Sequence, residues 1–472
     1  VLKIEKIGIH DNFFKIGGDS IISIQLVAKA RQAGVHLNVK DIFTYPTIAG
    51  LSSIAKTQET LLTLKPDQSS VSGEVIFTPI QSWFFEQDFK NVHHFNQAMM
   101  LKIKESIDPT LLKHAFEQLV SHHDALRLRY HKEGAHSWKQ SCEKEDLSSA
   151  NLLTVVDLSQ TSESHLASRI EEEAALIQGS LNIQTGPIIK AVLFNCGPNR
   201  QDRLLIVIHH LVVDGVSWRI LLEDLERVYG QLTQREDINL PPKTHSYQQW
   251  SQALREYASS EEIAKEVSYW QNIEQSIESL PVELHQKSSD RSSFSSLSLS
   301  LTQKENSDLL YQVPKAYRTQ INDILLTALV LAIGDWKGSY DLSLSLEGHG
   351  REDIIKDIDL SRTVGWFTSI FPVHLKLENP NDLGESIKTI KETLRQIPHK
   401  GIGYGILSYL TPNAPLKSLN HPSLSFNYLG QWDNTLEQKG IFEFTDESTG
   451  PAAASGEKAT YLLNINSEVR QG

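Results

Sequence analysis

The sequence predicts a small all-α unit at the N-terminus, followed by a much larger α/β region folded as two lobes. Residues 1–57 contain segments with helically spaced apolar residues, and the polar stretch 58–74 is typical of a linker. From residue 75 onward, strand-like and helix-like segments alternate without a short repeat. A chain of 472 residues exceeds one ordinary core, so we divide this region beside its serine-rich stretch, residues 288–298, into lobes 75–280 and 281–472.

The composition argues against several classes of protein. A formal net charge of −13 and a pI near 5.8 disfavour binding to nucleic acid or to an anionic membrane surface. The longest apolar run, Ile324–Ile333, is far shorter than the roughly 18 residues of a membrane helix. Two cysteines, Cys142 and Cys196, cannot form a disulfide framework, and we expect a soluble cytoplasmic protein.

The N-terminal unit presents a serine at the start of a helix. Gly17 and Gly18 form a turn before Ser20, and the helical pattern that follows stops at Gly34. A second helix is predicted after Pro46. An N-cap is the commonest role for such a serine, but a helix N-terminus also favours a phosphate ester on the hydroxyl.

The segment HHLVVDGVSW, residues 209–218, is the first candidate for chemistry in the larger region. The preceding run, Leu204–Ile208, predicts a strand buried on both faces, and a helix follows Gly215. Because side chains alternate along a strand, only one of His209 and His210 can serve as a base in a given pocket. The other histidine is then structural.

Two alternatives accompany the histidine motif. The histidines can be core residues beside an Asp-Gly turn, and for the isolated motif this interpretation is favoured. A metal site is the other alternative, but the sequence supplies no further cluster at ligand spacing.

A second candidate lies in DLSLSLEGHGRE, residues 341–352. The alternation places Glu347 on the serine face of a strand, where it can act as a general base. The competing interpretations are that Glu347 is a solvated edge residue or a partner for Arg351. For the motif taken in isolation, these interpretations are favoured. Arg351 can instead pair with Asp214 from the other lobe and hold the histidine turn in shape.

DNFFKIGGDSIISIQL, residues 11–26, resembles the peptidyl carrier domain of nonribosomal peptide synthetases. The resemblance covers residues 4–56 and implies a domain at 1–57 that lacks the first helix of the family. It also implies that 4′-phosphopantetheine is attached to Ser20.

The larger region resembles the epimerization domain of the same synthetases, which shares the chloramphenicol acetyltransferase fold with condensation domains. The resemblance rests on TPIQSWFF, HHLVVDGVSW, NDILLTAL, EGHGRE, RTVGWFTS, PHKGIGYG and FNYLGQWD in this order. It implies a two-lobed α/β (α+β) domain with a cleft between the lobes, and L-to-D epimerization of an aminoacyl or peptidyl thioester on the preceding carrier. The carrier's position directly upstream and its GGDS sequence also resemble epimerizing modules.

Carried over from this family, His210 and Glu347 are the catalytic pair, and Asn427 and Tyr428 lie near the substrate or enolate. Tyr428 could donate to the enolate oxygen or pack at a lobe interface. His209, Asp214 and Arg351 support the site.

The resemblance implies no metal, and a prosthetic group only on Ser20. The implied partners are the chain's own carrier, a phosphopantetheinyl transferase, an upstream adenylation domain and a downstream condensation domain. Two rival functions are a condensation domain that forms a peptide bond, and a non-catalytic docking domain of the same fold. EGHGRE argues against the first rival, and the intact histidine motif argues against the second.

Overall fold

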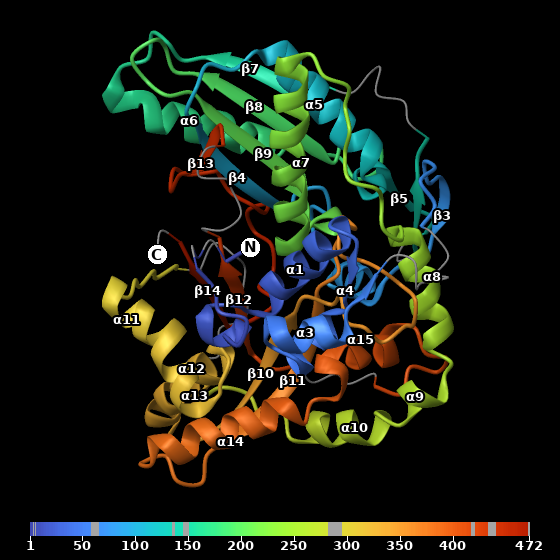
Figure 1. Ribbon diagram of the computed structural model, residues 1–472, viewed down its shortest axis with the longest axis vertical. Helices are drawn as coiled ribbons and strands as arrows, with labels where there is room; N and C mark the ends of the chain where they lie inside the picture. The colour runs from blue at the N-terminus through green and yellow to red at the C-terminus, as the bar shows by residue number, and fades with distance from the viewer. Residues whose placement is uncertain are drawn as a thin grey trace.

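The computed structural model describes residues 1–2, 4, 6–57, 66–134, 137–144, 151–281, 295–416, 421–432 and 440–470 (Figure 1). The predicted linker falls partly outside these ranges, at residues 58–65, and so does part of the serine-rich stretch, at residues 288–294. No helix within the described ranges is long and apolar enough to cross a membrane.

The N-terminal unit, residues 1–57, is a small helical bundle. Its elements are η1 (Phe13–Ile16), α1 (Ser20–Gln32), α2 (Val39–Thr44), α3 (Ile48–Ile54) and the short paired strands β1 (Val35–His36) and β2 (Lys56–Thr57). Ile22, Ile24 and Ile42 are fully buried between the helices. The sequence prediction placed the second helix after Pro46 and missed α2, which has only six residues and is stabilised by a capping box between Asn38 and Asp41.

The first sheet of the larger region has five strands in the order β13-β4-β9-β8-β7. Its strands are β4 (Asn96–Ile103), β7 (Leu153–Asp157), β8 (Ile189–Asn195), β9 (Arg203–His209) and β13 (Phe442–Phe444). Helix α6 (Glu163–Gln178) packs on one face, and α5 (Pro109–His122) and α7 (Gly215–Gln234) pack on the other. The strand β9 is therefore buried on both faces, as its unbroken apolar run predicts.

The second sheet has the order β11-β10-β12-β14, with β10 antiparallel to β11 and parallel to β12. Its strands are β10 (Asp341–Gly348), β11 (Ser369–Lys376), β12 (Leu424–Gln431) and β14 (Leu463–Val469). The helices nearby are α10 (Val267–Gln275), α13 (Ile321–Lys337), α14 (Leu383–Arg395) and α15 (Ile402–Tyr409). Ser343 and Ser345 are buried, so the serine face of β10 is interior and not a polar surface.

The remaining elements are short or connect the two sheets. They are β3 (Gly73–Val75), α4 (Pro79–Glu86), η3 (Asp124–Arg127), β5 (Leu128–Lys132), β6 (Trp138–Cys142), η4 (His210–Val212), α8 (Tyr247–Tyr257), α9 (Glu261–Ala264), α11 (Gln303–Ser307), η6 (Asp308–Gln312), α12 (Val313–Tyr317) and η7 (Pro398–Gly401). Strands β3, β6 and β5 form a small third sheet.

The two sheets exchange segments along the chain. Strand β13 comes from the C-terminal part but pairs with β4 of the first sheet. Helix α10 comes from the other side of the 280/281 boundary, yet its Trp270 packs on Phe371 of β11. A single cut at 280/281 therefore does not assign each element to the sheet that it covers.

Candidate functional site

The two histidines lie where β9 turns into a 3-10 helix. His209 is the last residue of β9 and is fully buried. Its Nε2 bonds to the carbonyl of Val92 at 2.9 Å, and its Nδ1 accepts from the backbone N–H of Leu211 at 3.2 Å. Burial lowers the pKa of His209 to about 3, so this ring stays neutral and is held by the backbone on both nitrogens.

His210 opens the 3-10 helix and has a different environment. Its Nδ1 lies 2.8 Å from the carbonyl oxygen of Val213, which can only accept, so Nδ1 carries the proton and Nε2 holds a lone pair. The side-chain amide of Gln97 donates to that Nε2 at 3.1 Å, and its oxygen accepts from the indole of Trp218 at 2.8 Å. Burial lowers the pKa of His210, so the ring is neutral and can accept a proton at Nε2.

An ion pair joins the histidine turn to the second sheet. Asp214 caps α7 by accepting from Ser217 N–H at 2.8 Å, and its other oxygen accepts from Arg351 Nη1 at 2.6 Å. Arg351 is buried, lies over the Phe367 ring at 3.9 Å, and also donates to the hydroxyl of Ser217 at 3.0 Å. The sequence predicted this pair, and the structure contains it.

Glu347 stands near the end of β10, in the second sheet. Its Oε2 accepts from the amide of Asn427 at 2.8 Å. Arg351 is engaged by Asp214, so the structure does not pair Glu347 with it. Burial raises the pKa of Glu347 to about 7, which places its titration at neutral pH.

Asn427 and Tyr428 point to opposite sides of β12, as neighbouring residues of a strand do. Asn427 contacts Glu347, whereas Tyr428 lies within electrostatic range of Asp19, Arg219 and Tyr311. Its hydroxyl is buried and has no hydrogen-bond partner among the described residues. Burial raises the pKa of Tyr428, so the phenol stays protonated and able to donate.

The N-terminal unit docks on the larger region through the start of α1. Gln431 donates to the carbonyl of Gly17 at 3.0 Å, and Ile21 packs close to Gly430. Arg219, which is buried beneath these residues, interacts electrostatically with Asp19. In Figure 1 the blue helices α1 and α3 accordingly lie against the larger region below α7.

The surroundings of the docked serine suit an attachment point. Ser20 is the first residue of α1 and is half-buried, and Asp19 beside it is the N-cap of the helix. Tyr428 Oη and Trp432 Nε1 are buried near this docking site and have no hydrogen-bond partner in the described part of the chain. Such donors fit a long polar group that enters from Ser20.

Some of these residues could not be found from sequence patterns. Gln97 reaches His210 only because β4 pairs with β9, with Gln97 opposite Ile208. Trp366, whose ring lies 4.3 Å from that of His210, belongs to the RTVGWFTS motif, in which the sequence alone singles out no residue for the site.

The structure also assembles a cluster that the sequence did not indicate. His122, His123 and Asp224 have ligand atoms within 4.8 Å of one another. Arg362 donates to Asp224 at 2.5 Å, and a cation in that position opposes metal binding. The cluster therefore links helices and carries no argument for a metal.

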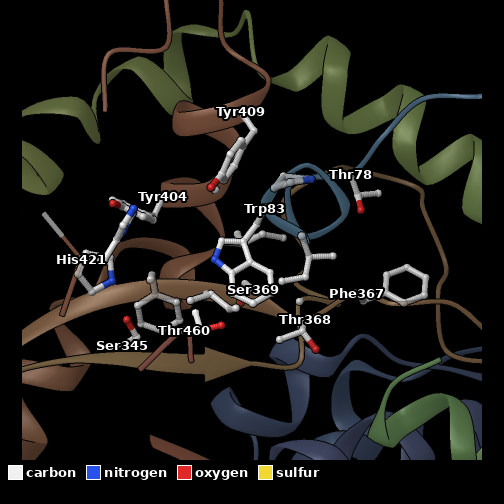
Figure 2. A pocket seen from close by; sticks show the side chains of 18 of the residues that line it. Thr78, Trp83, Ser345, Phe367, Thr368, Ser369, Tyr404, Tyr409, His421 and Thr460 are labelled. Carbon is white, nitrogen blue, oxygen red and sulfur yellow. The ribbon is translucent and has the colours of Figure 1, made fainter. Parts of the chain in front are cut away.

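A large pocket opens beside the catalytic candidates (Figure 2). It lies between α4, α15 and β11 and comprises about 910 Å³ when its open mouth is included. In Figure 2 the indole of Trp83 lies between the helix that carries Tyr409 and the strand that carries Ser345.

The family comparisons agree with this architecture. Residues 1–54 match the phosphopantetheine attachment site family, and residues 71–472 match the condensation domain family. The epimerization domain from the third module of tyrocidine synthetase B is 40% identical, with a TM-score of 0.79, over 87% of this chain and 91% of that one. The first condensation domain of the calcium-dependent antibiotic synthetase shares the fold at 15% identity and a TM-score of 0.63, over 84% of this chain and 87% of that one.

Two relatives place the chain among peptide synthetases. A linear gramicidin synthase polypeptide of Brevibacillus parabrevis is 44% identical over all of this chain and 9% of its own length, and a mycosubtilin synthase polypeptide of Bacillus subtilis is 41% identical over all of this chain and 18% of its own length. The chain belongs to the nonribosomal peptide synthetase family, as a carrier domain (the N-terminal unit) followed by a condensation-type domain of the epimerization group. It spans less than a fifth of the length of these relatives.

Proposed function

We propose that the chain epimerizes, from L to D, the α-carbon of an aminoacyl or peptidyl thioester carried by its own carrier domain. The observation that carries this proposal is that the turn after β9 and the end of β10, which the Asp214–Arg351 ion pair joins, each hold a proton-transfer group. His210 is a neutral base with a lone pair on Nε2, and Glu347 is a carboxyl group that titrates near neutral pH. The 40% identity to an epimerization domain supports the same reaction.

The chemistry needs one proton removed and one returned. A thioester acidifies the α-hydrogen because the electron pair left by the broken C–H bond moves onto the carbonyl oxygen. When that pair returns to carbon and a proton arrives from the other face, the configuration is inverted and nothing is consumed. Two acid-base groups facing opposite sides of the α-carbon are sufficient, and we assign these roles to His210 and Glu347.

The other site residues orient this pair. Asn427 holds the Glu347 carboxyl group, and Asp214 with Arg351 fixes the turns that carry both groups. His209 anchors the end of β9. Tyr428 is a protonated donor on the docking side, so we propose that it donates to the carbonyl oxygen where negative charge develops, or to the arm that leads there.

The substrate must reach the site on an arm. The phosphopantetheine of the carrier domain supplies a thioester link to the acyl group when it is bound, and we propose Ser20 as its attachment point. A phosphopantetheinyl transferase, an upstream adenylation domain and a downstream condensation domain are the partners that we propose, and the cytoplasm is the compartment. We further propose domains at 1–57 and 75–472 with a linker at 58–74.

One experiment tests the function directly. The carrier is loaded at Ser20 with an L-aminoacyl or L-peptidyl pantetheine, and both α-proton exchange with deuterated water and the D/L ratio are followed. We expect exchange and a D/L ratio that approaches equilibrium, and both should be lost in His210→Ala although loading remains intact. Loading without exchange or D-product overturns the proposal, and peptide bond formation to an acceptor carrier would indicate a condensation domain. Ser20→Ala should abolish loading.

A further inference from the structure

We propose that the pocket between α4, α15 and β11, which we call the acyl pocket, binds the N-acylated, apolar part of a peptidyl substrate. The natural substrate would then be a peptidyl thioester and not an aminoacyl thioester. This inference rests on the proposed epimerization and names the substrate class of that site.

The acyl pocket adjoins both proton-transfer groups. On one side, Trp83 lines the pocket and contacts Trp366, whose ring packs on that of His210. On the other side, Ser345 lines the pocket from the same face of β10 that carries Glu347. A group attached to the reacting carbon can therefore extend into the pocket.

The lining has no charge to offer an ammonium group. Among the described residues that form it there is no Asp, Glu, Lys or Arg, and aromatic and aliphatic side chains predominate. They include Ile80, Trp83, Trp250, Leu254, Phe367, Phe371 and Ile402. The hydroxyl groups of Tyr404 and Tyr409 donate to Glu274 and Glu86 at 3.0 Å and 2.6 Å, so these two carboxylates are already bonded. An aminoacyl group carries its positive charge next to the reacting carbon, and burying that charge unpaired is unfavourable, whereas an N-acyl group is neutral.

One side chain that lines the acyl pocket, Ser369, can form a hydrogen bond with a peptide. The hydroxyl oxygen of Ser369 is buried and has no hydrogen-bond partner among the described residues. Ser369 lies opposite Gly348 in the pairing of β10 with β11, one residue beyond Glu347. A substrate amide that enters the pocket next to the reacting carbon would satisfy this hydroxyl.

The acyl pocket is built by the larger region, away from the docked start of α1. None of the described residues that line it belongs to the carrier domain, so its mouth is separate from the side on which Ser20 docks. Upstream residues of a peptide can leave through this mouth while the arm enters from the carrier.

The test compares binding of two stable amide analogues to the didomain with an unmodified Ser20. One is phenylalanyl-aminopantetheine, and the other is N-acetyl-leucyl-phenylalanyl-aminopantetheine. By calorimetry we expect the peptidyl analogue to bind at least about tenfold more tightly. We expect Ser369→Ala to weaken only the peptidyl analogue, by about 3- to 10-fold, the effect of one hydrogen bond.

A second variant guards against effects on folding. Thr460 is exposed at the mouth, so Thr460→Trp should narrow it and reduce the preference for the peptidyl analogue, whereas Lys458→Trp, an exposed position outside the lining, should not. Equal or tighter binding of the aminoacyl analogue overturns the inference.

Exchange measurements on the two loaded carriers then separate this inference from the proposed function. Comparable exchange on both substrates together with equal binding refutes the acyl pocket and leaves epimerization standing. Preferential peptidyl binding without exchange on either substrate supports the acyl pocket and refutes epimerization.

Discussion

Arg351 and Asp214 are bonded at 2.6 Å, and each lies four residues beyond one member of the proposed catalytic pair. Asp214 follows His210 by four residues, and Arg351 follows Glu347 by four residues. His210 lies in the turn after β9, and Glu347 lies near the end of β10. One buried ion pair therefore connects the two places where proton transfer is proposed. The pair fixes their relative position, which neither sheet could do by itself.

Loss of this ion pair should affect both folding and exchange. Arg351→Ala leaves the Asp214 carboxylate buried without its cation, so we expect the free energy of unfolding to fall by about 3–5 kcal/mol and α-proton exchange to be strongly slowed. Denaturant titration and the exchange assay measure the two effects. Lys304→Ala, which removes an exposed ion pair with Asp308, is the control and should change neither. An Arg351→Ala variant with unchanged exchange would show that the ion pair does not position the catalytic groups.

The pH dependence of exchange should reveal the carboxyl group. The active state holds one proton on the pair, so kcat/KM should fall as pH rises through about 7, where Glu347 loses its proton. Asn427 donates to this carboxyl group and favours its charged form. We therefore expect the falling limb to move to higher pH in Asn427→Ala. A limb that stays in place would mean that another group carries that proton.

The Glu347 carboxyl group should also lower the stability of the folded protein at alkaline pH. Its pKa is raised from 4.5 to about 7 in the folded protein, so the folded protein keeps a proton that the unfolded chain has lost between these values, and stability falls as pH rises through this window. Glu347→Gln should accordingly raise the Tm at pH 8 and leave it nearly unchanged at pH 4, by scanning calorimetry. Glu443→Gln, at an exposed position, provides the matched control. An equal shift at both pH values would trace the effect to packing instead.

The sequence allowed the local parts of the site to be predicted, because they depend on short-range rules. The Gly-Gly turn before Ser20, the Asp-Gly turn after the histidines and the apolar period of α7 are each encoded within a few residues. Alternation along one strand was also enough to place Glu347 on the same face as Ser345. The predicted pairing of Arg351 with Asp214 is present in the structure.

Contacts that depend on the pairing of distant strands could not be predicted. Gln97 and His210 meet because β4 and β9 are in one particular register, and no pattern in either segment specifies it. The side to which Tyr428 points could not be predicted either, because it depends on which face of β12 meets the docked carrier domain. The helix α2 was missed because six residues give too short an apolar period to detect.

Gln97 should act as a positioning residue for His210. Its amide orientation is fixed by Trp218, so that an N–H and not an oxygen faces Nε2. In Gln97→Glu a carboxylate faces the ring and favours the imidazolium form, so we expect the rising limb of the kcat/KM profile to move to higher pH. Gln97→Met has similar size and only removes the hydrogen bond to the neutral ring, so its rising limb should move upward by less than that of Gln97→Glu. Identical profiles for the two variants would refute the role that we assign to the amide.

Docking of the carrier domain should depend on an ion pair at its edge. Arg31 of α1 pairs with Asp359 of the larger region, and both side chains are only about one-fifth exposed, at 21% each. Arg31→Asp places two carboxylates together, so we expect exchange on the carrier-bound substrate to fall by about tenfold or more.

The substrate that bypasses docking provides the control for this prediction. A free aminoacyl or peptidyl pantetheine thioester needs no carrier contact, so its exchange should be the same in Arg31→Asp as in the unaltered chain. The double variant Arg31→Asp with Asp359→Arg restores the ion pair with its charges reversed. It should therefore recover much of the exchange rate on the carrier-bound substrate. If the single variant slows the free substrate equally, the change has disturbed the catalytic region and the ion pair has no specific role in docking.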